Sequence, residues 1–243
     1  YDGINHCLST FDQQKLTPKQ RSDVLTELKQ LVCSAWQTDE IRQHRPTPID
    51  EAKWGFTTIE QTLWNAIPKF IRELNVLVKD NCEKALPLNI APVRFASWMG
   101  GDRDGNPNVT HKVTQEVLWL SRWKATDLYL RDIEDLRWDL SIQNCSEELQ
   151  KALGNSHPEP YREYLRNTRE RLKITRAWLS AKLQGKHSDV DRSQIIHHKD
   201  ELLQPLLLCY RSLVDSNLAE IANGKLLDFI YRVNCFGQRT RSI

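Results

Sequence analysis

Residues 92–110 read PVRFASWMGGDRDGNPNVT, and they contain the one convincing strand pattern of the chain. In Pro92–Trp98 the apolar side chains of Val93 and Phe95 alternate with other residues, as in a half-buried strand. The loop that follows, Met99–Thr110, holds three of the nine glycines of the chain within six residues. A single strand cannot satisfy its own backbone hydrogen bonds. Pro92–Trp98 therefore either pairs with strands outside this sequence or does not form a strand here.

The pattern around this stretch is helical nearly throughout. Thr17 and Gln20 form a capping box with Pro18 at the first helical position, which predicts a helix start. Pro68 falls inside the second helical pattern and predicts a kink or a break. The apolar stripe of the first helix, predicted to face a core, comprises Val24, Leu25, Leu28, Leu31, Val32, Ala35 and Trp36. The predicted helices cover about 17–42, 48–82, 113–141, 147–153, 159–183, 198–215 and 218–232, with a weak spot at Asn223-Gly224.

The pattern predicts a mainly α chain with one or two strands at most. We expect a single partial domain over 1–243, built from a helical pair over 17–82, a strand plus glycine-rich loop over 92–110, and a helical region over 111–232. The only methionine is Met99 and the chain opens on Tyr1, so we expect a piece of a longer protein.

Composition excludes several classes of partner and chemistry. The 34 Lys and Arg nearly balance the 32 Asp and Glu, which gives a net charge of +2 and no bulk attraction for nucleic acid or anionic membranes. No apolar run approaches the ~18 residues of a membrane span. The sequence has no CxxC, HExxH or GxSxG motif, so it predicts no metal site, redox pair or serine-hydrolase elbow within this chain.

The glycine-rich loop is the densest polar cluster of the chain. It follows a strand pattern and precedes a helix, which is where open sheets and barrels place their ligands. Arg103 supplies a planar set of donors suited to a carboxylate or a phosphate. Asp102 and Asp104 flank it and could orient its guanidinium or face a metal. Two interpretations stay open: a tight turn whose aspartates cap local amides and pair with Arg103, or an anion or substrate site.

The loop matches neither of two common ligand-binding motifs, the P-loop and the calcium-binding loop. The spacing from Gly100 to Gly105 is that of a P-loop, but Asn106-Pro107 stands where Lys-Ser/Thr is required. Asp102, Asp104 and Asn106 imitate the start of a calcium loop, but its sixth position is Pro107 and its twelfth is Val113.

Two further clusters carry positive charge. The segment Thr38–Glu51 gathers Arg42, His44 and Arg45 with four carboxylates, which indicates either surface ion pairs or a site where Arg42 or Arg45 faces an anion. Five cations recur at helical spacing on one face, and indicate either a solvated face or a surface for an anionic partner: Arg162, Arg166, Arg169, Lys173 and Arg176.

Several of these segments together resemble the phosphoenolpyruvate carboxylase family. The segments are Phe95–Thr110, Thr38–Arg42, Arg45–Pro48 with Asp50-Glu51, Leu120–Asp127, Glu159–Arg162, Ile221–Gly224 and Val233–Gly237. The resemblance runs from about Leu16 to Gly237, and Gln238–Ile243 departs from the pattern of the family. It implies a helical slice of a TIM-barrel-like α/β enzyme, with Pro92–Trp98 as a barrel strand.

The resemblance also implies an activity and its cofactor. Family enzymes are longer carboxylases that join bicarbonate to phosphoenolpyruvate with Mg²⁺ or Mn²⁺, giving oxaloacetate for the tricarboxylic acid cycle. It implies a cytoplasmic, allosteric homotetramer. The catalytic histidine and lysine and the metal ligands of the family have no counterpart in this sequence, so we expect no catalytic residue here and no activity from the isolated chain.

The resemblance implies two groups of site residues. Those expected to line the substrate pocket are Trp98, Gly100, Gly101, Asp102, Arg103, Asp104, Gly105 and Asn106. Trp98 would form an apolar wall that keeps water from the enolate, and Arg103 would contact an anion. Arg42 and Arg176 match positions that bind a phosphate-type activator. The alternative hypothesis is a stand-alone helical module that binds a phosphorylated metabolite without catalysis.

Overall fold

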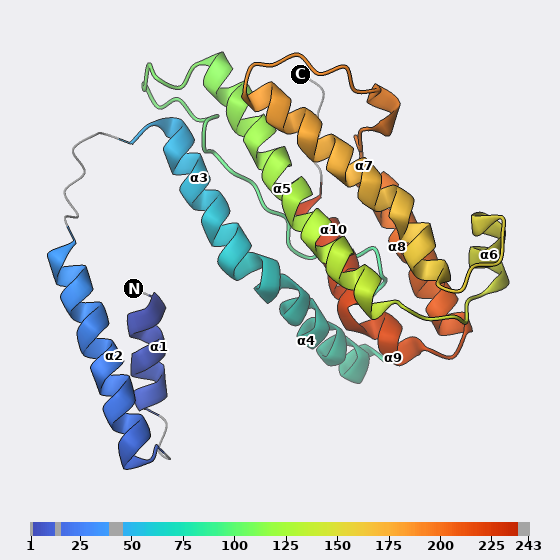
Figure 1. The fold of residues 1–243 in the computed structure, drawn as a ribbon, viewed down its shortest axis with the longest axis horizontal. Helices are drawn as coiled ribbons and strands as arrows, with labels where there is room; N and C mark the ends of the chain where they lie inside the picture. The colour runs from blue at the N-terminus through green and yellow to red at the C-terminus, as the bar shows by residue number, and fades with distance from the viewer. Residues whose placement is uncertain (1, 13–15, 39–45, 238–243) are drawn as a thin grey trace. The chain divides into compact units, whose positions relative to one another are not determined.

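The computed structural model describes residues 2–12, 16–38 and 46–237. The chain divides into two compact units, an N-terminal unit over Tyr1–Pro46 and a C-terminal unit over Thr47–Ile243. Every regular element among the described residues is helical (Figure 1). The mainly α prediction is therefore confirmed. The two helices predicted as a pair over 17–82 lie in different units.

The N-terminal unit is a pair of helices, α1 (Asp2–Phe11) and α2 (Pro18–Gln37). The predicted capping box is present: Gln20 N donates to Thr17 Oγ1 at 3.3 Å, and Thr17 N donates to Gln20 Oε1 at 3.0 Å. The sequence pattern did not predict α1. Cys7 of α1 is buried, and the absent side chain of Gly3 lets α1 approach Leu31 of α2 closely.

The apolar stripe of α2 is covered only in part: Val24, Leu28, Leu31 and Ala35 are half-buried, whereas Leu25, Val32 and Trp36 are exposed. No residue of α2 is buried, and Trp36 is 85% exposed. The physical reason is the size of its neighbour in the unit, because α1 has only ten residues with which to cover a helix twice as long.

The C-terminal unit holds the remaining helices. The described α-helices are α3 (Pro48–Thr58), α4 (Trp64–Cys82), α5 (His111–Asp139), α6 (Glu147–Leu153), α7 (Pro160–Leu183), α8 (Lys199–Asp215), α9 (Ala219–Ile221) and α10 (Leu227–Phe236). Two π-helical turns, η1 (Ile59–Leu63) and η3 (Ala222–Leu226), and a 3₁₀ turn, η2 (Arg192–Gln194), join some of them. The helices predicted after Pro48 are thus confirmed within a few residues. The weak spot at Asn223-Gly224 falls inside η3, where Gly224 leaves helical geometry.

The core of this unit is built around α5. α5 packs antiparallel to α7 along most of its length (Figure 1). Side chains of α5 and α7 such as Ile133, Tyr161, Leu165 and Leu172 are fully buried. The hydroxyls of Tyr161 and Ser212 on α8 share a hydrogen bond of 2.9 Å, so the polar tip of a buried tyrosine has a partner.

α3, η1 and α4 run as one continuous helix around the predicted Pro68 defect. Proline has no N–H, so the carbonyl of Trp64, four residues earlier, loses its helical partner. Arg232 of α10 supplies one, since its Nε donates to the Trp64 carbonyl at 2.8 Å. The π turn η1 ends directly before Trp64. The helix therefore continues through Pro68, and the irregular turn is η1, which lies one turn before the proline.

The predicted strand Pro92–Trp98 forms no strand in the part of the chain that the structure describes. By itself the chain forms no strand here, and pairing of Pro92–Trp98 with strands outside this sequence stays a prediction. The alternation that suggested a strand is nevertheless real, because Val93 and Phe95 pack on the core while Arg94 and Ala96 are exposed. Phe95 stacks on Phe236 with ring centroids 4.8 Å apart. With no neighbouring strand, the backbone has no ladder to join.

None of the helices in the described ranges is long and apolar enough to cross a membrane.

Candidate functional site

The base of the glycine-rich loop is anchored between α3 and α5. Met99 packs with Phe56 and Val117, and its side chain lies so close to Gly55 of α3 that a Cβ there would be 2.5 Å from its Sδ. Gly100 has a φ of +69°, and a Cβ on it would lie 2.6 Å from Val117 Cγ2 on α5. Both the conformation and the space at Gly100 require glycine.

Hydrogen bonds fix the path of the backbone above this base. The Trp98 carbonyl accepts from the N–H groups of Gly101 and Asp102, each at 2.9 Å. Thr114 of α5 donates its hydroxyl to the Gly100 carbonyl at 2.6 Å. Asn106 Oδ1 accepts from the Asn108 N–H at 3.0 Å. The loop is therefore held in one shape by its own turns and by the first turn of α5.

The tip of the loop is open to solvent. Trp98 is 70% exposed, and Gly101, Asp102, Arg103, Asp104, Gly105 and Asn106 are all exposed. Neither aspartate forms an ion pair with Arg103 among the described residues, so the tight-turn interpretation lacks the pairing that it expected. The Arg103 guanidinium and the Trp98 indole are thus exposed above a base anchored by packing and hydrogen bonds, an arrangement able to contact an anionic ligand.

The residues of this loop do not form a site for the divalent cation that the family resemblance implies. Asp102 and Asp104 offer two exposed carboxylates. Across the described ranges, no three His, Cys, Asp or Glu side chains gather closely enough to hold a metal ion.

Of the two residues predicted to bind an anionic activator, Arg42 and Arg176, the structure describes only Arg176. Arg42 lies outside the described residues. Arg176 is bound to Asp127 of α5, with Nη1 to Oδ1 at 2.7 Å. Asp127 is buried and also accepts from Arg131 Nη2 at 2.7 Å, while Glu60 of η1 binds both Arg131 and Lys124. Arg176 thus belongs to an ion-pair network that joins η1, α5 and α7.

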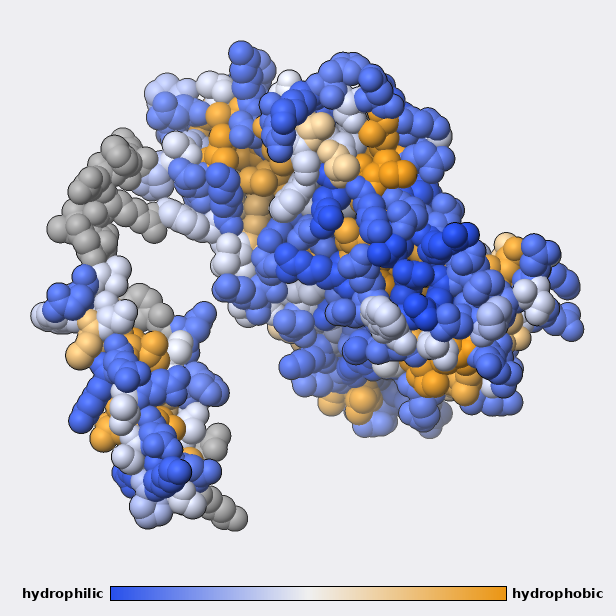
Figure 2. Space-filling view, viewed as in Figure 1, coloured by the Kyte–Doolittle hydropathy of each residue, from blue (hydrophilic) through white to orange (hydrophobic). Residues whose placement is uncertain are grey.

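The face with five cations is neutralised by carboxylates. Each of its members has an acidic partner: Arg162 with Glu159, Arg166 with Glu163, Arg169 with Glu134 and Glu170, Lys173 with Glu170, and Arg176 with Asp127. The surface over α7 is mainly hydrophilic in Figure 2. These pairs favour the solvated interpretation of this face over a surface for an anionic partner.

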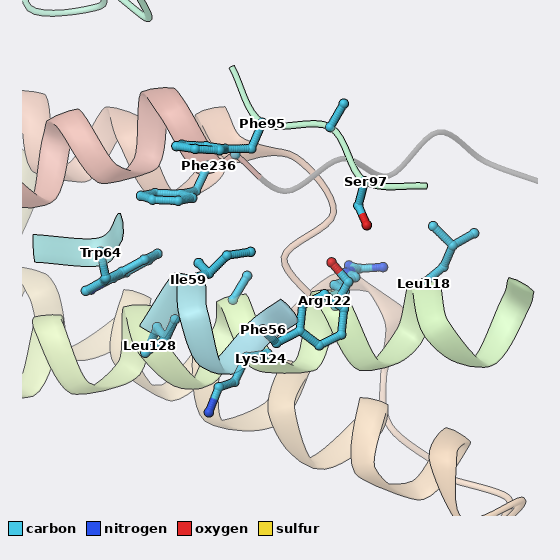
Figure 3. Close-up of a pocket in the computed structure, with 14 residues that line it drawn as sticks. Phe56, Ile59, Trp64, Phe95, Ser97, Leu118, Arg122, Lys124, Leu128 and Phe236 are labelled. Atoms are coloured by element: carbon cyan, nitrogen blue, oxygen red, sulfur yellow. The ribbon is translucent and has the colours of Figure 1, made fainter. Parts of the chain in front are cut away.

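A cavity of about 290 Å³ is lined in part by Phe95–Ser97, the residues that come just before the loop in the chain (Figure 3). Its lining residues come from α3, η1, α4, α5, the segment before Trp98, and the end of α10: Phe56, Ile59, Trp64, Phe95, Ala96, Ser97, Leu118, Ser121, Arg122, Lys124, Ala125, Leu128, Phe236 and Gly237. The sequence predicts no role for Arg122, since Leu120–Asp127 contributes only to the family resemblance. A cation within an apolar run was the available signal, but the sequence does not show what surrounds it.

Comparison with known proteins gives the family. Residues 1–242 match the family described as Phosphoenolpyruvate carboxylase. The chain is 77% identical over 237 residues to a protein of Acinetobacter baumannii and 76% identical to one of Acinetobacter baylyi. It is 51% identical to a protein of Marinobacter nauticus. Each of these relatives is named phosphoenolpyruvate carboxylase.

The chain belongs to the phosphoenolpyruvate carboxylase family, as the sequence resemblance predicted. Each alignment covers 98% of this chain but only 26–27% of the relative. The chain therefore spans about a quarter of the length of these relatives.

Two glycines of the loop form a matched pair for a test of the anchored base. Gly100 and Gly105 both have a positive φ, but a Cβ on Gly105 would meet nothing within 4 Å. We predict that Gly105→Ala lowers the free energy of unfolding by about 1–2 kcal/mol from backbone strain. Gly100→Ala should lower it by about 1–3 kcal/mol more, because it overpacks against Val117. Urea unfolding measures both; equal losses would contradict the anchored base.

The ion-pair network predicts a pH dependence of stability. The hydrogen bond from Lys124, together with Arg131, lowers the pKa of Glu60 below its ordinary value. A carboxylate with a lowered pKa in the folded state stabilises the fold above its unfolded pKa of about 4.3, and this stabilisation is lost as the pH falls below that value. We predict that Glu60→Gln costs about 2 kcal/mol at pH 7 and that the difference from wild type shrinks toward pH 3.

The control for this prediction is Glu163→Gln, which removes an exposed pair with Arg166 and should change stability little at any pH. Urea unfolding of all three proteins between pH 7 and pH 3 makes the comparison. A wild-type advantage over Glu60→Gln that stays constant over this range would show that the charge of Glu60 is not what stabilises the fold.

Proposed function

We propose that the full-length protein containing this chain is a phosphoenolpyruvate carboxylase. The observation that carries the proposal is the family match over residues 1–242, together with 77% identity to a relative of that name. In the proposed reaction, the phosphoryl group moves from the enol oxygen of phosphoenolpyruvate to a bicarbonate oxygen, which leaves the enolate of pyruvate. The enolate carbon then attacks the carboxyl carbon, phosphate leaves, and oxaloacetate forms.

We propose that the glycine-rich loop lines the substrate pocket of that enzyme. Its rigid base between α3 and α5 and its exposed tip support this role, since a positioned contact contributes more to catalysis than a mobile one. Arg103 would donate to an anionic oxygen of the substrate. The indole of Trp98 would cover the enolate and exclude water, because an enolate that meets a proton donor becomes pyruvate instead of oxaloacetate.

Other properties of the proposed enzyme follow from the family resemblance. The metal would be Mg²⁺ or Mn²⁺, with ligands supplied by other parts of the full-length protein. The proposed assembly is a cytoplasmic homotetramer whose oxaloacetate replenishes the tricarboxylic acid cycle. Arg42 and Arg176 would contact a phosphate-type activator, which would have to compete with Asp127 for Arg176.

A chimaera tests the activity directly. Residues 1–237 of this chain replace the aligned region of the Acinetobacter baumannii relative, and the formation of oxaloacetate from phosphoenolpyruvate and bicarbonate is measured. The isolated chain should be inactive, because it spans only 26% of that relative. A chimaera that folds and assembles like the relative but forms no oxaloacetate would refute the proposal.

In the same chimaera we predict that Trp98→Ala raises the ratio of pyruvate to oxaloacetate among the products by about tenfold, whereas Trp98→Phe keeps it low. Trp138→Ala is the matched control, since Trp138 is 73% exposed and lies near the far end of α5. Both products are quantified by coupled dehydrogenase assays. An unchanged product ratio in Trp98→Ala would remove Trp98 from the role of excluding water.

A further inference from the structure

The cavity before the glycine-rich loop, here called the Arg122 cavity, combines apolar walls with a cation. Phe95, Phe236 and Leu118 supply apolar surface, and Ser97 and Ser121 supply hydroxyls. In Figure 3 the side chain of Ser97 points toward α5, on the side where Arg122 lies. A volume of about 290 Å³ is at the small end of ligand sites in proteins.

Arg122 has no carboxylate partner among the described residues. Its Nη2 donates to the Ile196 carbonyl at 2.5 Å, and its guanidinium lies 5.6 Å from the centre of the Trp178 ring. Its Nε is buried and has no hydrogen-bond partner in the described structure. Glu201 attracts Arg122 electrostatically but is itself bonded to Arg171. Burial lowers the pKa of Arg122, as expected where the charged form is poorly solvated.

This contrasts with the other cations near the cavity. Lys124, which also lines it, is bound to Glu60, and Arg232 is bound to Asp132 at 3.0 Å. A partly buried guanidinium that forms no ion pair is costly, and an anion that reaches it recovers part of that cost through charge-assisted hydrogen bonds. A carboxylate of the protein is paired with Lys124 and with Arg232, whereas none is paired with Arg122 among the described residues.

We propose that the Arg122 cavity binds a small monocarboxylate with an apolar body, whose carboxylate accepts hydrogen bonds from Arg122. One guanidinium that forms no ion pair matches one negative charge. The aromatic and aliphatic walls match an apolar body better than a phosphate or a polyol. The hydroxyls of Ser97 and Ser121 can donate to the same carboxylate. This site does not depend on the proposed carboxylase activity, since Arg122, the apolar walls and the two serine hydroxyls are present in the chain whatever reaction the longer protein catalyses.

Calorimetric titration of the 243-residue chain and of the chimaera with benzoate tests the proposal. We expect saturable binding with a Kd of about 1 mM, and binding at least tenfold weaker for benzamide, the neutral compound of nearly the same shape. Arg122→Gln should weaken benzoate binding at least tenfold. Arg137→Gln is the matched control, because Arg137 is also half-buried, donates to a backbone carbonyl and has no carboxylate partner among the described residues.

A second variant keeps the test decisive if Arg122→Gln does not fold. Leu118→Trp narrows the cavity from its exposed rim, leaves Arg122 in place, and should also weaken benzoate binding at least tenfold. Equal binding of benzoate and benzamide, or no saturable binding to the folded chimaera, would overturn the proposal. Binding to the isolated chain but not to the chimaera would also overturn it, because the rest of the full-length protein would then fill the cavity.

Discussion

Five consecutive residues of α5, Thr126–Leu130, are buried, so this helix has no solvent-facing side at its centre. Burial all round a helix requires neighbours on every side. α7, α3 and α10 supply them, with α7 as the most extensive contact. The placement of these helices around α5 also fixes the loop before it, because Gly100 packs on Val117 and Thr114 binds the Gly100 carbonyl. The candidate site thus takes its geometry from the helix that begins beside it.

Complete burial at the centre of α5 also sets an electrostatic condition. Asp127 lies inside the buried stretch, and an unpaired buried carboxylate would cost several kcal/mol. Arg131 on α5 and Arg176 on α7 neutralise this carboxylate, each by binding one of the two oxygens of Asp127. Glu60 extends the network to η1 through Arg131 and Lys124. Arg176, which the sequence presented as part of a cationic face and as an activator residue, therefore contributes to holding three elements together.

Local signals made much of the fold predictable. The capping box at Thr17 predicted the start of α2 within a residue, because a cap depends on side chains only three positions apart. The features that the sequence did not predict depend on contacts between residues far apart in the chain. The exposure of the α2 stripe depends on the length of its neighbour, and the rescue of the Trp64 carbonyl depends on Arg232, 168 residues away.

At the candidate site, too, local features could be predicted from the sequence and features that depend on distant contacts could not. The turn-forming glycines and the exposed Arg103 could be predicted from composition and position. The role of Arg176 could not, because its partner Asp127 lies on another helix. The lack of an ion pair at Arg122 was equally hidden, since only the folded chain shows that nearby carboxylates are bound to other cations.

The most direct test of this account is amide hydrogen exchange of the 243-residue chain, measured by mass spectrometry with peptides that resolve Thr126–Leu130. If α5 is the element on which the other helices depend, its amides open only in global unfolding and exchange most slowly in the chain. The amides of α2, which has no buried residue, should exchange far faster. Exchange at Thr126–Leu130 as fast as in α2 would contradict the central place of α5.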